Sequence, residues 1–160
     1  MSLWHKPDWW KPRCVIMNKE KEMQLVYKGH PALSTISEPV NGEDVTELID
    51  IMRSEMTRYG GIGIAANQVG VAKRVIIIRA KKFKAVMIDP VIVRTWGQKI
   101  FSNEGCLSFP GITGRMSRYQ NLVVEYMDED HQPVKRKLKG LAAIVCQHEI
   151  DHLNGITIDD

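Results

Sequence analysis

The sequence predicts an α+β fold, because one helical stretch stands on each side of a middle that is rich in β-forming runs. The 160 residues are 44% hydrophobic and 26% charged, which is ordinary for a globular chain. We find no internal repeat, low-complexity tract or linker in them. We therefore expect one domain over residues 23–160, preceded by an extension, residues 1–22, that has no clear periodicity and is partly disordered.

The first helix is predicted from an apolar stripe with helical spacing. The stripe consists of Val45, Leu48, Ile49, Met52 and Met56. Asn41 is the candidate N-terminal cap, and the glycine pair at 60–61 is expected to end the helix. A short strand is expected earlier in the chain, at Met23–Tyr27.

The strand-rich middle and the second helix follow. Five runs are predicted to be strands: Val75–Ile78, Ala85–Val93, Gln98–Ser102, Leu122–Tyr126 and Val134–Leu138. The last two flank a polar turn, Asp128–Gln132, which indicates a hairpin. The second helix is expected over Leu141–Leu153, because Asn154 and Gly155 then form a stop signal.

Composition excludes several classes of protein. The net charge of +3 is too small to indicate a nucleic-acid partner, and the basic clusters at 81–84 and 135–139 are interpreted as solvated faces. No apolar run approaches the roughly 20 residues that a membrane-spanning helix needs. Three scattered cysteines do not make a disulfide framework, and no signal peptide is visible. These features favour a reducing compartment, with the cytoplasm as the default.

The strongest local motif is the HEIDH stretch at residues 148–152 in the second helix. His148 and His152 are four residues apart, so both imidazoles lie on one helical face and can reach one metal ion. Glu149 is then placed to take a proton from a water molecule at the metal. Apolar residues one and two turns earlier continue the same face, which indicates that the histidines point inward.

A catalytic metal site usually has a third protein ligand. Too little chain follows His152 for a downstream ligand of the known types, so we expect it upstream, among Cys106, His30, His131 and several acids. Cys106 is favoured, because a thiolate binds transition metals well and Cys106 lies between glycine-marked bends. Cys146 lies about 200° around the helix from His148 and is assigned to packing, and Cys14 is given no role.

The glycine-rich stretch at 60–68 indicates a close approach between backbone and a ligand. Its small residues leave room beside the chain, and Gln68 offers an amide donor and acceptor. The pattern matches neither a phosphate-binding loop nor a dinucleotide fingerprint. A tight connection between helix and strand would explain it equally well.

Three motifs in this order resemble those of the peptide deformylase family: GIGIAANQ at 61–68, EGCLS at 104–108 and HEIDH at 148–152. The resemblance covers residues 23–160. It implies an α+β fold of mostly antiparallel sheets packed around a central metal-binding helix. It also implies an enzyme that removes the formyl group from the N-terminal formyl-methionine of new polypeptides and releases formate.

The resemblance assigns roles to individual residues. The metal ligands would be Cys106, His148 and His152, and the general base and acid would be Glu149. Gln68 and the backbone N–H of Leu107 would stabilise the oxyanion, and Gly63 would contact the substrate backbone. The implied metal is one Fe²⁺ per chain, with Zn²⁺, Ni²⁺ or Co²⁺ as substitutes.

Apolar residues near the motifs are candidates for a methionine pocket and equally for the plain core. They are Ile62, Leu141, Ile144 and Val145. We also hypothesise that Arg118 forms an ion pair with Glu104 or Asp151, which would brace the ligands.

The sequence departs from the family pattern at its end, because the usual C-terminal tail is absent after residue 160. Ribosome association is therefore not assumed. Short forms occur among phage and some organellar members; a phage source is compatible with the sequence, and the acid-containing extension argues against an organellar one. We expect a monomer that acts on formyl-methionyl nascent peptides, without membrane or nucleic-acid binding. The alternatives are another metal-dependent amidohydrolase or peptidase and an inactive relative.

Overall fold

The computed structural model describes residues 23–160, so the expected extension at 1–22 lies outside the described residues. Five strands form one antiparallel sheet in the order β1-β2-β3-β4-β5. The strands are β1 (Gly63–Ala65), β2 (Val75–Ala80), β3 (Phe83–Gly105), β4 (Thr113–Met127) and β5 (Pro133–Lys139). The helices are α1 (Thr46–Arg58) and α2 (Leu141–Leu153), with short 3-10 turns η3 (Pro31–Ser34) and η4 (Ala66–Val69).

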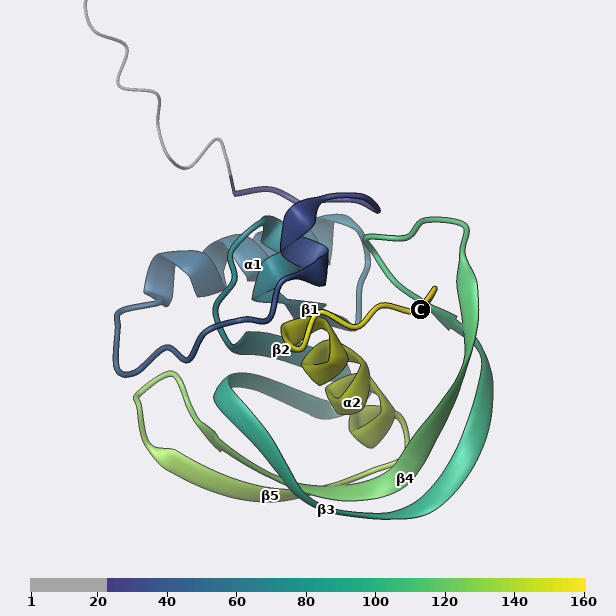
Figure 1. Cartoon of the computed structure of the whole chain (residues 1–160). Helices are drawn as coiled ribbons and strands as arrows, with labels where there is room; N and C mark the ends of the chain where they lie inside the picture. Colours follow the sequence, from purple (N-terminus) through teal and green to yellow (C-terminus); the bar gives the residue numbers. More distant parts are fainter. Residues whose placement is uncertain (1–22) are drawn as a thin grey trace, which may run out of the picture.

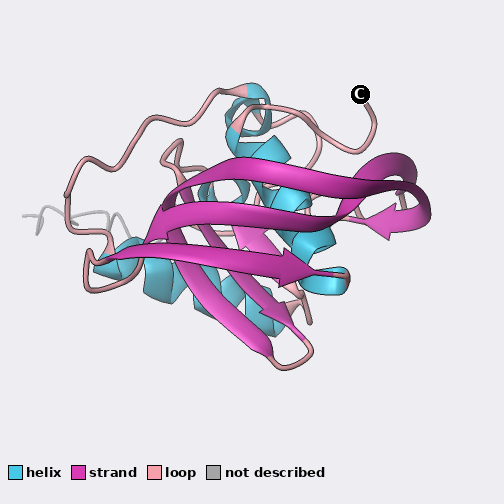
Figure 2. Ribbon diagram, turned by 90° about the horizontal axis from the view of Figure 1, so that it is seen from below, coloured by secondary structure: helices cyan, strands magenta, loops and turns pink. Residues whose placement is uncertain are grey.

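The second helix, α2, lies at the centre of the molecule. The long strands β3, β4 and β5 curve around it, while α1 lies on the other side of β1 and β2 (Figure 1). Seen from below, the same three strands run side by side as one curved sheet (Figure 2). The α+β prediction, with antiparallel strands around a central helix, is therefore confirmed.

Strand β2 is buried on both faces because a helix covers each of them. Val75 and Ile77 pack in one hydrophobic cluster with residues of α1. Ile76 and Ile78 alternate with them and pack in a second cluster with residues of α2. This period of two explains why the run reads as continuously apolar in the sequence. The second cluster holds the buried face of α2 against the sheet.

Helix α1 follows its apolar stripe, and all five predicted stripe residues are buried. The expected cap was wrong. Asn41 lies in a turn with a φ of 52°, and the helix begins at Thr46, with Val45 at the N-cap position. The carboxylate of Asp44, one residue before the N-cap, accepts a hydrogen bond from the N–H of Thr46 at 2.9 Å and so satisfies the first helical N–H.

The predicted strand at Met23–Tyr27 is not formed. This segment is held by isolated bonds instead: Leu25 N–H donates to the Glu55 carboxylate at 2.9 Å, and Val26 N–H donates to the Gln68 carbonyl at 2.8 Å. Such partners satisfy the backbone without a sheet ladder.

Two predicted strands, Ala85–Val93 and Gln98–Ser102, are parts of the single strand β3. Residues between them remain paired with β4, as in Thr95 with Leu122. Three register shifts along the β3–β4 pair absorb the irregular residues, and one of them lies between Phe101 and Glu104. Bulges bend a strand, and this one lies just before Cys106, which follows the end of β3. The predicted hairpin between β4 and β5 is confirmed.

None of the helices in residues 23–160 has the length and apolar character needed to cross a bilayer.

Candidate metal centre

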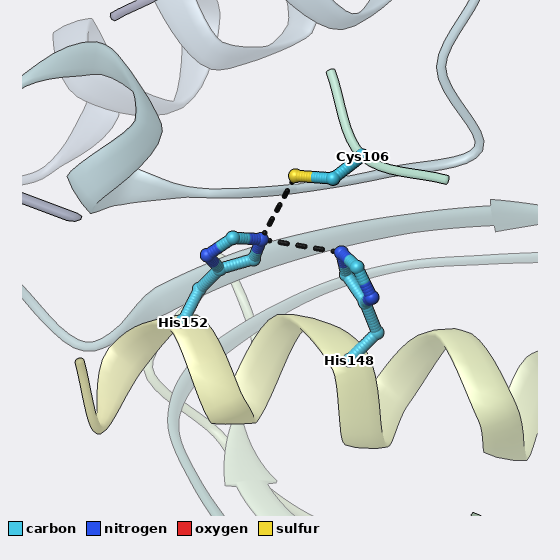
Figure 3. Close-up of side chains that lie close together, drawn as sticks. All are labelled: Cys106, His148 and His152. Atoms are coloured by element: carbon cyan, nitrogen blue, oxygen red, sulfur yellow. Dashed lines mark hydrogen bonds between the residues drawn. The ribbon is translucent and has the colours of Figure 1, made fainter. Parts of the chain in front are cut away.

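Cys106, His148 and His152 converge at one point (Figure 3). The Nε2 atom of His152 lies 3.2 Å from Cys106 Sγ and 3.2 Å from His148 Nε2. All three potential ligand atoms lie within 4.8 Å of one another. The histidines come from successive turns of α2, and Cys106 directly follows the end of β3.

The other proposed third ligands lie elsewhere. His30 caps η3, where its Nδ1 accepts a hydrogen bond from Ala32 N–H at 3.2 Å. His131 belongs to the turn between β4 and β5. Within residues 23–160, the three-residue group of Cys106, His148 and His152 is the one that the structure brings together. Cys146 is buried in the hydrophobic cluster beneath α2, as predicted.

The three donors fit a transition-metal cation. Burial, with the positive charge of His148, lowers the pKa of His152 to about 3. Its ring is therefore neutral near pH 7, and a neutral imidazole binds metals. A thiolate and two imidazoles form a donor set suited to Zn²⁺ or Fe²⁺.

Glu104 orients His148 through Nδ1, the ring nitrogen that does not face the ligand group. Its Oε1 lies 2.5 Å from His148 Nδ1, which leaves Nε2 directed at the ligand group. Burial favours the neutral acid, but hydrogen bonds from His148 and Arg118 outweigh it and hold the pKa of Glu104 at about 2. Burial likewise opposes the charged form of His148, yet contacts with Cys106 and Glu104 raise its pKa to about 10.

Arg118 bridges both candidate acids, which confirms the ion-pair hypothesis. Its Nε and Nη2 atoms contact the Glu104 carboxylate at 3.1 and 2.5 Å, and Nη1 donates to Asp151. Arg118 is only 4% exposed. The bridge therefore ties the end of β3 to the metal-binding helix through a cation on β4.

We predict that Arg118→Met destabilises the protein. The change leaves the buried Glu104 carboxylate without its cation, and breaking a buried pair in this way costs about 3 kcal/mol. Urea unfolding with saturating metal measures the difference. Arg115→Met, at an exposed position of the same strand, should change the free energy of unfolding by less than about 0.5 kcal/mol. Equal effects of the two substitutions would contradict the bracing role.

Glu149 lies beside the ligands with an unpaired carboxylate oxygen. Its side chain is buried, and its Oε2 has no hydrogen-bond partner among residues 23–160. Burial raises its pKa to about 7. A carboxylate of this kind exchanges protons readily near neutral pH, which is what general acid–base catalysis requires.

Gly63 leaves the space that Glu149 occupies. A Cβ atom at Gly63 would lie 2.4 Å from Glu149 Oε1 and 2.6 Å from Val145 Cγ1. A Cβ at Gly61 would instead meet the flexible end of Leu107, at 2.7 Å. The glycine-rich stretch thus supplies a close approach at the site, beyond the tight connection that would also explain it.

Gly63→Ala is therefore expected to lower kcat/KM by about 10- to 100-fold, since it displaces Glu149. Steady-state kinetics of the metal-loaded protein measures this. Gly61→Ala provides the matched comparison and should cost less, because the end of a leucine side chain moves more easily than a buried carboxylate. An equal or smaller loss for Gly63→Ala would contradict this account.

Gln68 reaches the site from η4. Its Nε2 lies 3.4 Å from Cys106 Sγ and 3.2 Å from Ser108 Oγ, and its Oε1 accepts from Ala65 N–H at 2.9 Å. The buried Ser108, which sequence reasoning missed, holds the amide in this orientation. Its only sequence signal was membership of the EGCLS motif.

A cavity of about 510 Å³ opens beside these groups. Every predicted site residue lines it except His152, which is buried at 1% exposure. The predicted lining residues are Ile62, Gly63, Gln68, Cys106, Leu107, Leu141, Ile144, Val145, His148 and Glu149. Phe101 and Asn103 also line it; the sequence places Phe101 in a separate strand, Gln98–Ser102, and assigns no role to Asn103. The lining of the cavity is mostly apolar and includes Glu149.

Within residues 23–160, a curved antiparallel sheet surrounds a helix that completes a Cys-His-His group beside the acid Glu149, and these are the features of a metal-dependent hydrolase. The family model that matches this chain, over residues 22–160, is that of polypeptide deformylase. The chain therefore belongs to the polypeptide deformylase family, whose enzymes remove the formyl group from N-terminal formyl-methionine.

Relatives and solved structures agree. The peptide deformylase of Thermodesulfovibrio yellowstonii is 43% identical over 131 residues, which are 79% of this chain and 78% of the relative. That of Karelsulcia muelleri is 39% identical over 71% of this chain, and the match spans 62% of the relative. The PDF of the Vibrio parahaemolyticus bacteriophage VP16T, in complex with actinonin, superposes with a TM-score of 0.81 at 47% identity. That match covers 85% of this chain and 100% of the phage protein.

Proposed function

We propose that this chain removes the N-formyl group from formyl-methionyl peptides, with Cys106, His148 and His152 as metal ligands and Glu149 as the general base and acid. The observation that supports this best is the position of Glu149. Its carboxylate is buried and free on one oxygen, and it belongs to the same helix as the two histidines. It also lines the apolar cavity that Cys106 and His148 line.

Glu149 acts on the proton of the attacking water. A divalent metal, when bound, lowers the pKa of water and polarises a carbonyl group. Glu149 Oε2 accepts the proton and later delivers it to the leaving amine. Its pKa of about 7 allows both directions of transfer.

The Gln68 amide and the Leu107 N–H stabilise the negative charge that develops on the formyl oxygen. The Gln68 Nε2 donor is already on the Cys106 side of the cavity, where Ser108 orients it. Each such donor contributes roughly 3 kcal/mol to transition-state stabilisation. A preoriented amide does this without reorganisation during the reaction.

Substrate binding combines an apolar pocket with a free strand edge. Ile62, Leu141, Ile144 and Val145 line the cavity and accommodate the methionine side chain. Among the described residues, strand β1 pairs with β2 alone and forms one edge of the sheet, so an extended peptide can pair with the backbone at Gly63. In this proposed binding mode the formyl group lies near Glu149.

We propose Fe²⁺ as the metal in the cell, with Zn²⁺, Ni²⁺ or Co²⁺ as substitutes. One thiolate and two imidazoles are compatible with all four ions. Metal analysis after purification without oxygen tests this assignment: about one iron per chain supports it, and zinc alone under those conditions contradicts it. We further propose that the protein is cytoplasmic, because its substrates are newly made polypeptides. We also propose that it is a monomer, and sedimentation tests this oligomeric state.

Mass spectrometry of the products tests the substrate class. A formyl-methionyl tripeptide should lose its formyl group and keep both peptide bonds. The acetylated tripeptide, which carries one extra methyl group at the reacting carbon, serves as the control and should remain largely intact. Cleavage of an internal peptide bond would favour a peptidase, and no reaction with a filled metal site would favour an inactive relative.

A further inference from the structure

Asn67 lies next to Gln68 in η4 but points in a different direction. It is completely buried, and its Nδ2 donates a hydrogen bond at 2.5 Å to the backbone carbonyl of His152. The other polar atom of this amide, Oδ1, is buried and has no hydrogen-bond partner among residues 23–160. A buried amide that uses only one of its two polar atoms is costly to keep.

His152 carries the complementary unpaired atom. Its Nε2 faces Cys106 and His148, and its second ring nitrogen faces away from both (Figure 3). This atom, Nδ1, is buried and likewise without a partner within the described part of the chain. If Nε2 binds a metal, the proton of the neutral ring must be on Nδ1. The ring then presents a buried N–H donor that needs an acceptor.

Within residues 23–160, His148 has such a partner and His152 does not. The Nδ1 of His148 is bonded to Glu104, which follows the usual rule that a metal-binding histidine is oriented through its other nitrogen. The unpaired acceptor on Asn67 belongs to a residue already bonded to His152. Ser37 Oγ is the other unpaired buried side-chain oxygen near this end of α2, since the Ser37 N–H donates to the carbonyl of Leu153 at 2.8 Å.

We propose that Asn67 is the positioning residue of His152, which rests on the proposed role of His152 as a metal ligand. The Nδ2 atom of Asn67 holds the backbone at His152, and its Oδ1 accepts the hydrogen bond from Nδ1–H of the ring in the metal-loaded protein. This bond fixes the tautomer that leaves Nε2 free for the metal. Asn67 thereby does for His152 what Glu104 does for His148.

Zn²⁺ affinity of the full chain, measured by competition with a chelator, tests the proposal with two variants of similar size. Asn67→Leu removes both the donor and the acceptor and should weaken Zn²⁺ binding by about 10- to 100-fold. Asn67→Asp lacks the Nδ2 donor but keeps an acceptor oxygen, so its affinity should stay within about threefold of the unmodified protein, given that carboxylates are common partners of metal-bound histidines. A purely structural role through Nδ2 predicts equal losses in the two variants, and that result would overturn the proposal.

Ser37→Ala is the matched control, and it should leave Zn²⁺ affinity unchanged. A loss in Ser37→Ala together with normal affinity in Asn67→Leu would assign the acceptor to Ser37 and overturn the proposal. Failure of the unmodified chain to bind Zn²⁺ would contradict the proposed metal ligands as well. Normal Zn²⁺ binding by both the unmodified chain and Asn67→Leu would contradict only the role of Asn67.

Nitrogen-15 NMR of the unmodified, zinc-loaded protein avoids any dependence on variant folding. The spectrum should show His152 protonated at Nδ1, with a proton that exchanges slowly with water. A fast-exchanging proton, or coordination through Nδ1, would overturn the proposal.

Discussion

Glu149→Gln is expected to reduce kcat by about 10²- to 10⁴-fold while the metal content stays at one ion per chain. Glutamine has nearly the same shape as glutamate, but it accepts no proton from the attacking water. Glu149 is not one of the three converging ligand atoms, so metal retention follows. Initial rates of formate release, with the metal counted in the same sample, measure both quantities.

Glu125→Gln is the matched control for this prediction. Glu125 is an exposed glutamate on β4 that pairs with Lys135 at 2.8 Å, far along the strand from Arg118. Its replacement should leave kcat unchanged, because exposed ion pairs contribute little. Turnover of Glu149→Gln within about threefold of the unmodified enzyme would refute the general-base role.

Cys106→Ser is expected to remove the metal almost completely. A serine hydroxyl stays protonated at neutral pH and is a weak ligand, so two imidazoles remain where the site needs three protein donors. Activity should fall with metal content. Metal analysis after dialysis measures the loss, and circular dichroism checks that the fold is retained.

Cys146→Ala is the comparison for the cysteine prediction, since Cys146 is the other thiol within residues 23–160. Burial raises the pKa of Cys146 to about 12, so it is an uncharged core side chain and no metal ligand. The alanine variant should be somewhat less stable but keep its full metal content. A full metal complement in Cys106→Ser would disprove the assigned ligand set.

The sequence was most informative about α2 because two different constraints coincide there. The spacing of His148 and His152 and the apolar residues on the preceding turns both require a helix with one buried face. Cys106 was favoured by chemistry and by the resemblance, and the structure brings it to the histidines. Most of the candidate site residues could therefore be predicted from short-range spacing and family motifs.

Contacts between distant segments were harder to predict. The bulges that join residues 83–105 into β3 depend on pairing with β4, which no local pattern reveals. Phe101 consequently went unrecognised as a wall of the cavity. The bond from Asn67 to His152 spans 85 residues, and asparagine beside Gln68 carries no periodic signal.

The predictions of the helix cap and of the first strand were wrong because local composition does not decide either of them. Asn41 is of a residue type that favours the cap position, but the helix begins five residues later, at Thr46, and Asp44 bonds the first helical N–H. Met23–Tyr27 has a strand-like composition, but its backbone bonds go to Glu55 and Gln68 in place of a neighbouring strand. Propensity alone cannot separate these outcomes.

Formate release from a formyl-methionyl peptide is the most direct test of the central claim. The protein should be purified without oxygen, loaded with Fe²⁺ and assayed beside Glu149→Gln at equal metal content. We predict stoichiometric formate and free methionyl peptide from the unmodified enzyme, and almost none from the variant. No formate from protein with a filled metal site, or equal formate from both proteins, would contradict the account.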